Sequence, residues 1–344
     1  MRAYELKSGD GINGLTRIDR ASTVLGPHDI RISIEATALN RRDLMFADGQ
    51  YGVAPDRAMI PLCDGAGKVV QTGAAVTRFK RGDHVIANFW PLWTDGEISP
   101  EKTSASFGAQ IDGTLAEELV ANEHALALAP RGLSSSEAAA IPCAGLTAWN
   151  ALVVRGDLKP GATVLLLGTG GVSVWALQLA HAAGLRPIVT SSSDEKLARA
   201  RELGAVETIN YRNTPEWQDE VQRLTGGRGV DLVLEVGGKG TMPRSIAAAR
   251  LGGTVIVIGG LSGPAEGGGA EPNALIGGAK ALAGIMVGSR TMLEDLVRFI
   301  DTAGIRPVVD RRFAFDDAVA AYRYMQSDGH FGKVVIDIDG ARRS

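Results

Sequence analysis

The chain has 344 residues, enough for two domains of ordinary size, and its 36 basic and 39 acidic residues give a net charge of −3. This near balance excludes the positive field that would attract nucleic acid or an anionic membrane surface. No apolar run has membrane-spanning length, the N-terminus lacks the apolar core of a signal peptide, and two cysteines cannot form a disulfide framework. We therefore expect a cytoplasmic protein that acts on a small molecule.

The first part of the chain, residues 1–125, is predicted to be rich in β-strands. Residues 29–36, 67–71 and 83–88 alternate or run apolar between glycine and proline turns, which is typical of a small barrel-like domain. Residues 91–113 are polar and predict a long loop. A capped helix is then expected to begin near Ser134, followed by a second helix up to about residue 154.

The central stretch, residues 163–184, changes character at its first glycine. Its front part is a short apolar run typical of a strand buried on both faces of a parallel sheet, and its back part repeats apolar residues at helical spacing. Between them a glycine-rich turn lets backbone N–H groups approach a pyrophosphate at the helix N-terminus. Ser173 stands where such turns usually carry a third glycine, and a purely structural turn is the alternative. The candidate phosphate-binding residues are Gly168, Gly170, Gly171 and Val172.

Strands and helices continue to alternate after this turn. Because alternation of this kind is typical of a doubly wound parallel sheet, we predict that architecture here. Helices are also expected at 295–303 and 316–325 and a strand at 332–338, and the tail from residue 305 is assigned back to the first domain. The last strand of the sheet is too apolar for an open edge, which predicts a homodimer formed by strand pairing across a two-fold axis. The expected strands are 186–190, 206–209, 230–236, 253–260 and 282–287, with helices near 195–203, 215–225 and 240–250.

The order of these parts resembles the medium-chain dehydrogenase/reductase superfamily. Besides the glycine turn, residues 61–70, 142–149 and 330–336 are similar to segments of that superfamily. The resemblance implies an α/β fold with a GroES-like β-barrel catalytic domain and a Rossmann dinucleotide-binding domain. The first would cover residues 1–125, completed by 305–344, and the second residues 126–304. Within the superfamily the chain is most similar to the zinc-free, quinone oxidoreductase-like branch and its alcohol dehydrogenase-like relatives.

The positions that bind the catalytic metal in zinc-dependent members are altered in this chain. Those members use Cys, then His followed by Glu, then Cys, whereas the matching positions here are Asn40, Cys63 with Asp64, and Cys143. A neutral amide is a poor zinc ligand, but the other three are chemically suitable. We expect a metal-free enzyme, with a zinc site at Cys63, Asp64 and Cys143 as one alternative and simple packing of both cysteines as another.

The end of the second strand of the sheet bears on which nicotinamide cofactor binds. An NAD site usually carries Asp or Glu there to bind the ribose hydroxyls, but this chain has Ser191 and Ser192. With no carboxylate to repel a 2′-phosphate, NADPH is expected over NADH. The resemblance adds Lys196 and Tyr211, which match a lysine and a tyrosine that flank this phosphate in the branch. An ordinary helix cap with an exposed lysine is the alternative.

Without a metal, polarisation of a carbonyl must come from hydrogen-bond donors. The acceptors that suit this best are quinones and α,β-unsaturated carbonyls, because they spread the incoming charge onto an enolate-like oxygen. For Arg41 and Arg42, a pyrophosphate contact or a solvated surface charge is the alternative to catalysis, and the resemblance places Lys333 near the cofactor. The candidate catalytic residues are Asn40, Arg42, Asp43 and Tyr51. Residues at strand ends are expected around the nicotinamide: Thr147, Gly237, Gly259, Gly260, Leu261, Val287 and Ser289.

The function expected from these patterns is NADPH-dependent, zinc-free reduction of activated alkenes or quinones. Two alternatives are a zinc-dependent alcohol or aldehyde dehydrogenase with altered ligands and a nucleotide-binding protein without turnover. Alkene, quinone and simple carbonyl reduction are not separated by the sequence, because a fold does not choose its chemistry.

Overall fold

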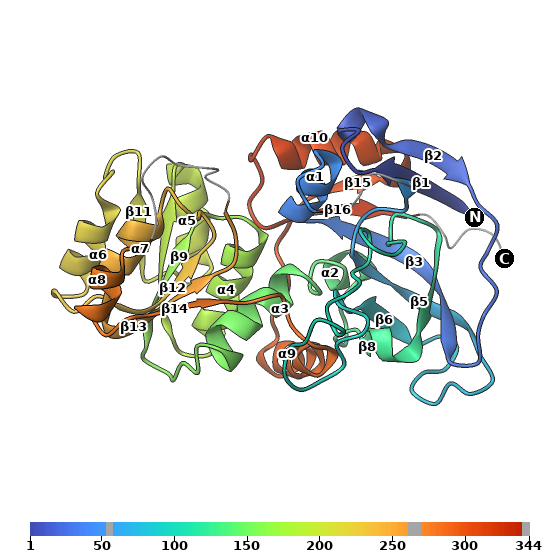
Figure 1. Ribbon diagram of the computed structural model, residues 1–344, viewed down its shortest axis with the longest axis horizontal. Helices are drawn as coiled ribbons and strands as arrows, with labels where there is room; N and C mark the ends of the chain where they lie inside the picture. The colour runs from blue at the N-terminus through green and yellow to red at the C-terminus, as the bar shows by residue number, and fades with distance from the viewer. Residues whose placement is uncertain (53–57, 261–269, 339–344) are drawn as a thin grey trace. The chain divides into compact units, whose positions relative to one another are not determined.

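The computed structural model describes residues 1–52, 58–260 and 270–338, and the chain divides into two compact units (Figure 1). Unit 1 comprises Met1–Leu146 and Gly288–Ser344, and unit 2 comprises Thr147–Val287. These boundaries differ from the expected ones at residues 126 and 304. The difference arises because helices α2 (Ser135–Ala138) and α9 (Arg290–Ala303) pack on strands of unit 1.

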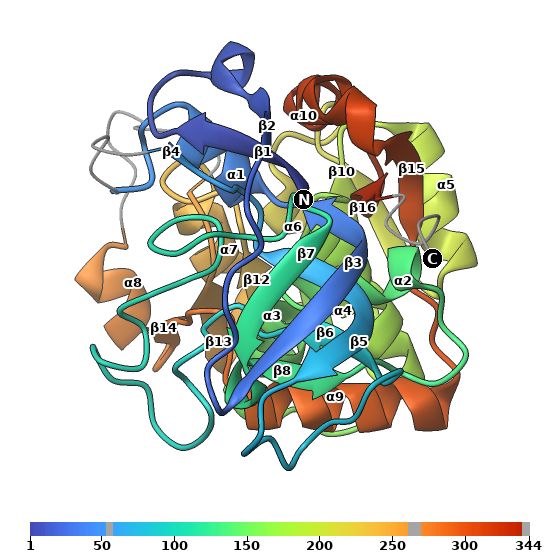
Figure 2. The same cartoon turned by 90° about the vertical axis from the view of Figure 1, so that its right-hand side faces the viewer.

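Two β-sheets form the described part of unit 1. A three-stranded sheet has the order β2-β1-β4, and a seven-stranded sheet has the order β15-β16-β3-β5-β6-β8, with β7 also paired to β3. Figure 2 shows β3 between β7 and β5. The strands are β1 (Arg2–Lys7), β2 (Thr16–Asp19), β3 (Asp29–Leu39), β4 (Ala58–Met59), β5 (Asp64–Thr72), β6 (His84–Ala87), β7 (Glu118–Asn122), β8 (Leu126–Leu128), β15 (Val309–Ala314) and β16 (Lys333–Asp337). The helices are α1 (Arg41–Ala47), α10 (Ala318–Gln326) and the short 3₁₀ turns η1 (Ile12–Gly14), η2 (Glu123–Ala125) and η4 (Phe315–Asp317), besides α2 and α9.

Strand β3 is the centre of unit 1. Its sequence alternates isoleucine with polar residues, and Ile30, Ile32 and Ile34 are all at most 1% exposed. This period of two gives one face to the core and leaves the other partly accessible. The long loop predicted at 91–113 carries no helix or strand apart from an isolated bridge between Phe107 and Ile111.

The register of β3 fixes which side chains meet at its C-terminal end. It pairs antiparallel with β16, where Leu39 faces Val334, and antiparallel with β5, where Ala38 faces Asp64. One step further along, Asn40 therefore lies beside Lys333 and next to the start of β5. Three segments that are far apart in the sequence therefore place polar residues close together at the C-terminal end of β3.

Unit 2 is a six-stranded parallel sheet in the order β11-β10-β9-β12-β13-β14. The order runs outward in both directions from β9 and β12, so the predicted doubly wound architecture is confirmed. Its strands are β9 (Thr163–Leu167), β10 (Arg186–Ser191), β11 (Glu207–Asn210), β12 (Val230–Glu235), β13 (Ala249–Val257) and β14 (Ala281–Gly284). Its helices are α4 (Gly171–Ala182), α5 (Asp194–Glu202), α6 (Trp217–Leu224), α7 (Met242–Ala248) and α8 (Pro272–Ile276).

Helices cover both faces of this sheet, with α4 on one side and α6 and α7 on the other (Figure 1). The central strand β9 is apolar because it is buried from both sides, with Val164, Leu165 and Leu166 fully inaccessible. Trp217 of α6 and Ile246 of α7 pack into the same core as Leu165. Burial of this apolar surface holds the strand ends, and hence the loops that follow them, in fixed positions.

Several predicted elements of unit 2 have different limits. Strand 253–260 begins earlier, as β13, and strand 282–287 shortens to the largely exposed β14. Helix α8 was not predicted, because Pro272–Ile276 is too short to show a period. The helix expected at 147–154 is instead α3 (Ala144–Trp149) followed by the π-helical turn η3 (Asn150–Val154).

Candidate functional site

A buried hydrogen-bonded cluster in unit 1 joins Asn40, Cys63, Asp64 and Lys333, and we call it the Asp64 cluster. The Asp64 side chain is 0% exposed and that of Lys333 is 2% exposed. The Lys333 ammonium donates to Leu39 O at 2.7 Å, to Asn40 Oδ1 at 2.7 Å and to Asp64 Oδ2 at 3.1 Å. An ammonium has three N–H donors, so all three are used.

Both oxygens of the Asp64 carboxylate are also fully used. Oδ2 accepts from Asn40 Nδ2 at 2.9 Å as well as from Lys333, and Oδ1 accepts from the Cys143 backbone N–H at 2.9 Å and from the Cys63 thiol at 3.6 Å. A charged pair can lie in the interior only if its remaining lone pairs and protons find partners. Here that condition is met by one amide, one thiol and two backbone groups.

The same corner contains the three potential zinc ligands. One ligand atom from each of Cys63, Asp64 and Cys143 lies within 4.8 Å of the others. A catalytic zinc site has three protein ligands with bonds of about 2.0–2.3 Å, but binding through Asp64 would displace donors that its carboxylate already holds. Asn40, at the remaining ligand position, has both amide atoms engaged by Asp64, Cys63 and Lys333. A zinc ion at these ligands would therefore have to replace hydrogen bonds that Asp64 already accepts.

Arg42 and Asp43, on helix α1, are buried supports of this corner. The Arg42 guanidinium stacks on the rings of Tyr51 and Phe89, with its central carbon 4.5 and 4.9 Å from their centroids. It also donates to Phe107 O at 2.8 Å. The Asp43 carboxylate accepts the Asn40 backbone N–H at 2.8 Å, and burial raises its pKa to about 6, against the opposing effect of the Arg42 charge.

Two tyrosines lie near these groups. Tyr51 is half-buried, and burial raises the pKa of its phenol, while the Arg42 charge acts in the opposite direction. Tyr322, on α10, was not predicted from the sequence. Its hydroxyl is fully buried without a hydrogen-bond partner among the described residues, and burial raises its pKa well above the usual value. An aromatic residue at helical spacing gives no sign that its hydroxyl faces a polar cluster.

In unit 2, the glycine-rich turn has the predicted strand, turn and helix arrangement. Gly168 has φ +75°, a conformation that favours glycine, and Gly170 is the N-cap of α4. Ser173, in place of the third glycine, is buried and donates its hydroxyl to Leu167 O at 2.7 Å. The serine therefore ties the helix to the strand that precedes it, and the helix N-terminus remains available to an anion.

A pocket of about 390 Å³ opens beside this turn, at the carboxyl ends of β9, β10 and β12. This is where doubly wound sheets bind their ligands. It brings together the predicted residues Gly168, Tyr211 and Gly237. The other lining residues, which the sequence did not single out, are Leu167, Thr190, Pro215, Trp217, Val236, Thr241 and Arg244.

Two of the lining residues, Gly237 and Thr241, are held in place by Glu235, the last residue of β12. It is fully buried, and its Oε1 accepts from the backbone N–H groups of Gly237 and Gly238 at 2.6 and 2.9 Å and from the Thr241 hydroxyl at 2.6 Å. Its Oε2 accepts from Ser245. A buried carboxylate with four donors holds the loop between β12 and α7 in one conformation.

The end of β10 carries hydroxyl groups and no carboxylate. Ser191 is buried, and its Oγ accepts the Ser193 N–H at 3.3 Å, while Ser193 caps α5 by accepting the Lys196 N–H at 3.3 Å. Ser192 and Lys196 are half-buried. The nearest carboxylate in sequence, Asp194, accepts from Asn210 Nδ2 at 2.7 Å.

The remaining predicted cofactor residues lie in different places. Gly259 and Gly260 follow β13 in unit 2. Thr147 and Val287 belong to the same unit: Thr147 is buried, and the Val287 carbonyl accepts from Asn150 Nδ2 at 2.8 Å. Leu261 lies outside the described residues. Arg41, Ser289 and Lys333 belong to unit 1: Arg41 pairs with Asp328 at 3.0 Å, and Ser289 is the N-cap of α9. A cofactor contact from Lys333 would require one of its three hydrogen bonds to break.

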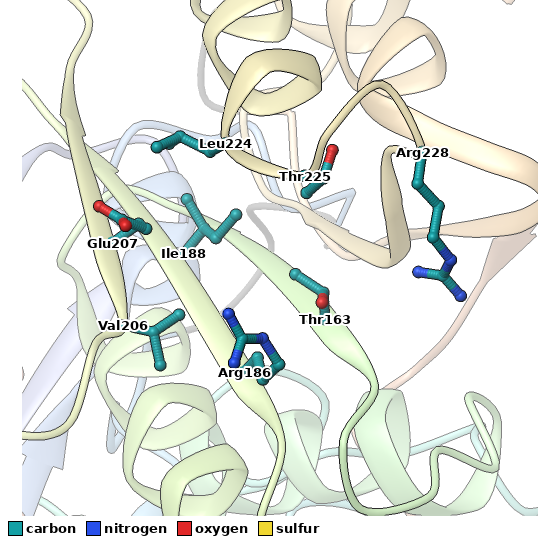
Figure 3. Close-up of a pocket in the computed structure, with 8 residues that line it drawn as sticks. All are labelled: Thr163, Arg186, Ile188, Val206, Glu207, Leu224, Thr225 and Arg228. Atoms are coloured by element: carbon teal, nitrogen blue, oxygen red, sulfur yellow. The ribbon is translucent and has the colours of Figure 1, made fainter.

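A second pocket of about 210 Å³ lies at the opposite, amino-terminal ends of the strands of the same sheet, where β9 and β10 begin. Figure 3 shows Arg186, Glu207 and Arg228 around it. Arg228 is already paired with Asp231 through both terminal nitrogens. Because ligands of such sheets bind at the carboxyl ends of the strands, this pocket is not the expected cofactor site.

In the described part of the chain, no helix combines the length and the apolar character needed to cross a membrane.

Comparisons with known proteins agree with this arrangement. Residues 26–131 match the family described as alcohol dehydrogenase GroES-like domain, and residues 171–302 match the family described as zinc-binding dehydrogenase. A zinc-type alcohol dehydrogenase-like protein of Schizosaccharomyces pombe is 42% identical, over 92% of each chain. A quinone oxidoreductase of Pseudomonas aeruginosa is 30% identical, over 90% of this chain and 91% of its own. The solved structure of a candidate alcohol dehydrogenase from Sinorhizobium meliloti has a TM-score of 0.90 at 38% identity and covers 98% of each chain.

Proposed function

Because this chain belongs to the medium-chain dehydrogenase/reductase superfamily and is an NAD(P)H-dependent oxidoreductase, we propose that it reduces a quinone or an α,β-unsaturated carbonyl with NADPH and without a metal ion. The Asp64 cluster is the observation that carries this proposal. Its ammonium, amide and carboxylate are mutually satisfied, so Asp64 could bind zinc only by giving up hydrogen bonds that it already accepts, and a catalytic zinc site needs three protein ligands.

NADPH supplies the hydride when bound, so the protein has to position the acceptor and stabilise the charge that develops on its oxygen. Tyr51 is the best-suited donor among the four predicted catalytic residues. Asn40, Arg42 and Asp43 are buried and hold one another and the neighbouring backbone, whereas the half-buried Tyr51 phenol is oriented by the Arg42 guanidinium beneath its ring. In this proposal Tyr51 donates a hydrogen bond to the enolate-like oxygen, and the other three fix its position.

The preference for NADPH is supported by the groups at the end of β10. Hydroxyls of Ser191 and Ser192 and the ammonium of Lys196 stand where an NAD site would carry a carboxylate. Asp194 accepts from Asn210, so a donor already faces this carboxylate. The proposed binding residues for the 2′-phosphate are Ser192, Lys196 and Tyr211, of which Tyr211 lines the pocket beside the glycine turn.

We also propose that the protein acts as a homodimer in the cytoplasm. Strand β14 is the edge of the six-stranded sheet, and Leu282 on it is 39% exposed. An exposed apolar edge strand is a template for pairing with a second copy across a two-fold axis.

The test of the reaction uses chelator-treated protein with NADPH and one α,β-unsaturated ketone, followed by identification of the product. A saturated ketone would support metal-free alkene reduction, and an allylic alcohol would point to carbonyl reduction. Turnover that appears only after zinc is added would contradict the metal-free proposal and agree with the name of the S. pombe relative. The absence of turnover with tight NADPH binding would identify a nucleotide-binding protein.

Two variants test the assigned roles. Tyr51→Phe keeps the ring over Arg42 and removes the hydroxyl, so kcat should fall by about 10²-fold or more at unchanged NADPH affinity. Ser192→Asp should raise the KM for NADPH by about tenfold or more and leave that for NADH nearly unchanged, because only the 2′-phosphate meets the new charge. An equal effect on both cofactors would contradict the assignment of this site.

A further inference from the structure

Cys63 and Cys143 form a close pair of thiols within unit 1, although they are far apart in sequence. Their Sγ atoms lie within 4.8 Å of each other, and both residues contact the same oxygen of Asp64, Cys63 through its thiol and Cys143 through its backbone N–H. A disulfide requires an S–S distance of about 2.05 Å, so a change of a few ångströms in side-chain position separates the two states.

The two thiols differ in accessibility. Cys63 is 0% exposed, whereas Cys143 is partly accessible to solvent. An oxidant in solution would therefore meet Cys143 first.

We propose that Cys143 and Cys63 are an oxidation site at which a hydroperoxide converts the pair into an intramolecular disulfide. In the first step the Cys143 sulfur attacks one peroxide oxygen: an S–O bond forms, the O–O bond breaks, and the departing oxygen takes a proton and leaves as water or an alcohol. In the second step the Cys63 sulfur attacks the resulting sulfenic acid: the S–S bond forms, the S–O bond breaks, and hydroxide leaves with the Cys63 proton as water. Two thiols lose two electrons in total, and the hydroperoxide gains them.

The disulfide would change the Asp64 cluster. Cys63 would lose the S–H donor that it directs at Asp64 Oδ1, and moving the Cys143 side chain would disturb the N–H bond to the same oxygen. Asp64 Oδ1 would then keep at most the Cys143 backbone N–H, while Lys333 and Asn40 still donate to Oδ2. Oxidation is therefore expected to lower turnover reversibly, by at least several-fold. This consequence depends on the proposed function, whereas formation of the disulfide does not.

The experiment uses the full-length protein, reduced, freed of metal with a chelator, and exposed to a small excess of hydrogen peroxide. The expected result is one Cys63–Cys143 cross-linked peptide in a non-reducing digest, a protein mass lower by two hydrogen atoms, and full reversal by dithiothreitol. A sulfenic acid trapped with dimedone should accumulate on Cys143 in Cys63→Ser and should not accumulate on Cys63 in Cys143→Ser.

Three outcomes would overturn the proposal. They are a cross-link between two molecules, peroxide oxidation confined to methionines, and dimedone labelling that is faster on Cys63 than on Cys143. NADPH oxidation measured before and after dithiothreitol is a separate readout. If the disulfide forms and no substrate is ever reduced, the proposed function fails and the oxidation site stands.

Discussion

Replacing Lys333 by methionine tests the central claim about the Asp64 cluster. The substitution keeps an unbranched side chain, one atom shorter, but removes three hydrogen bonds and the positive charge beside a carboxylate that is 0% exposed. Removing one partner of a buried ion pair costs about 3–5 kcal/mol, because the other charge is left without compensation. The matched control is Lys68→Met, in which Lys68 pairs with Glu35 at 3.6 Å with 58% of its side chain exposed. Such a surface pair is worth at most about 1 kcal/mol.

Cys63 offers a local assay of this loss. The chain has two units, so denaturation need not be a single transition. The buried Cys63 thiol, by contrast, reacts with a thiol reagent only when the cluster opens. In a Cys143→Ser background, which keeps the backbone N–H to Asp64, we expect Lys333→Met to accelerate labelling of Cys63 roughly 100- to 5,000-fold, the equivalent of 3–5 kcal/mol. Lys68→Met should accelerate it less than about fivefold.

A double variant separates charge from packing. Asp64→Asn combined with Lys333→Met removes both charges, and the Asn40 amide can turn over to accept from the new amide. Labelling of Cys63 should then be slower than in Lys333→Met alone. The reasoning is refuted if Lys333→Met labels no faster than Lys68→Met, or if adding Asp64→Asn makes the opening still faster.

Three further predictions concern other parts of the chain. The pKa of Asp43 in the folded protein is raised from 3.8 to about 6, so the folded state binds this proton more tightly than the unfolded state does. The stability of the wild type relative to Asp43→Asn should therefore fall by up to about 3 kcal/mol as the pH rises from about 4 to 7. Urea unfolding of both proteins at each pH measures this difference. Tyr322→Phe removes a buried hydroxyl without a hydrogen-bond partner among the described residues and should leave the thermal midpoint unchanged or raise it, whereas a loss above about 1 kcal/mol would reveal a bound partner. Leu282→Lys places like charges on a two-fold edge and should halve the mass measured by light scattering; an unchanged dimer would exclude pairing through β14.

Secondary-structure elements that are recognised from residues close together in the sequence were predictable. The strand, the turn at Gly168 and helix α4 follow one another within about 20 residues, and their apolar periods differ plainly. The limits of short elements were not predictable in the same way. Strand β14 is a four-residue, largely exposed segment, and its apolar neighbours made it look longer and more buried than it is.

The Asp64 cluster was predicted only as a set of separate residues. Asn40, Asp64 and Lys333 were each singled out, but as a catalytic donor, a potential zinc ligand and a cofactor contact. Their mutual hydrogen bonds depend on the register of β3 against β5 and β16, which pairs residues almost 300 positions apart and has no local signal. Thr241 was missed in the pocket of unit 2 because its position depends on a hydrogen bond to Glu235, a buried carboxylate that organises the loop before it.

The position of Lys333 on the last strand has a consequence for how the protein is made. Asp64 leaves the ribosome 269 residues before Lys333, so its counter-charge arrives only when β16 has been made. Until then the carboxylate cannot be buried at low cost, so unit 1 cannot close around it. We therefore expect a chain that stops before residue 333 to keep Asp64 in solvent and to leave unit 1 unfolded. The cluster thus makes synthesis of β16 a condition for folding of unit 1.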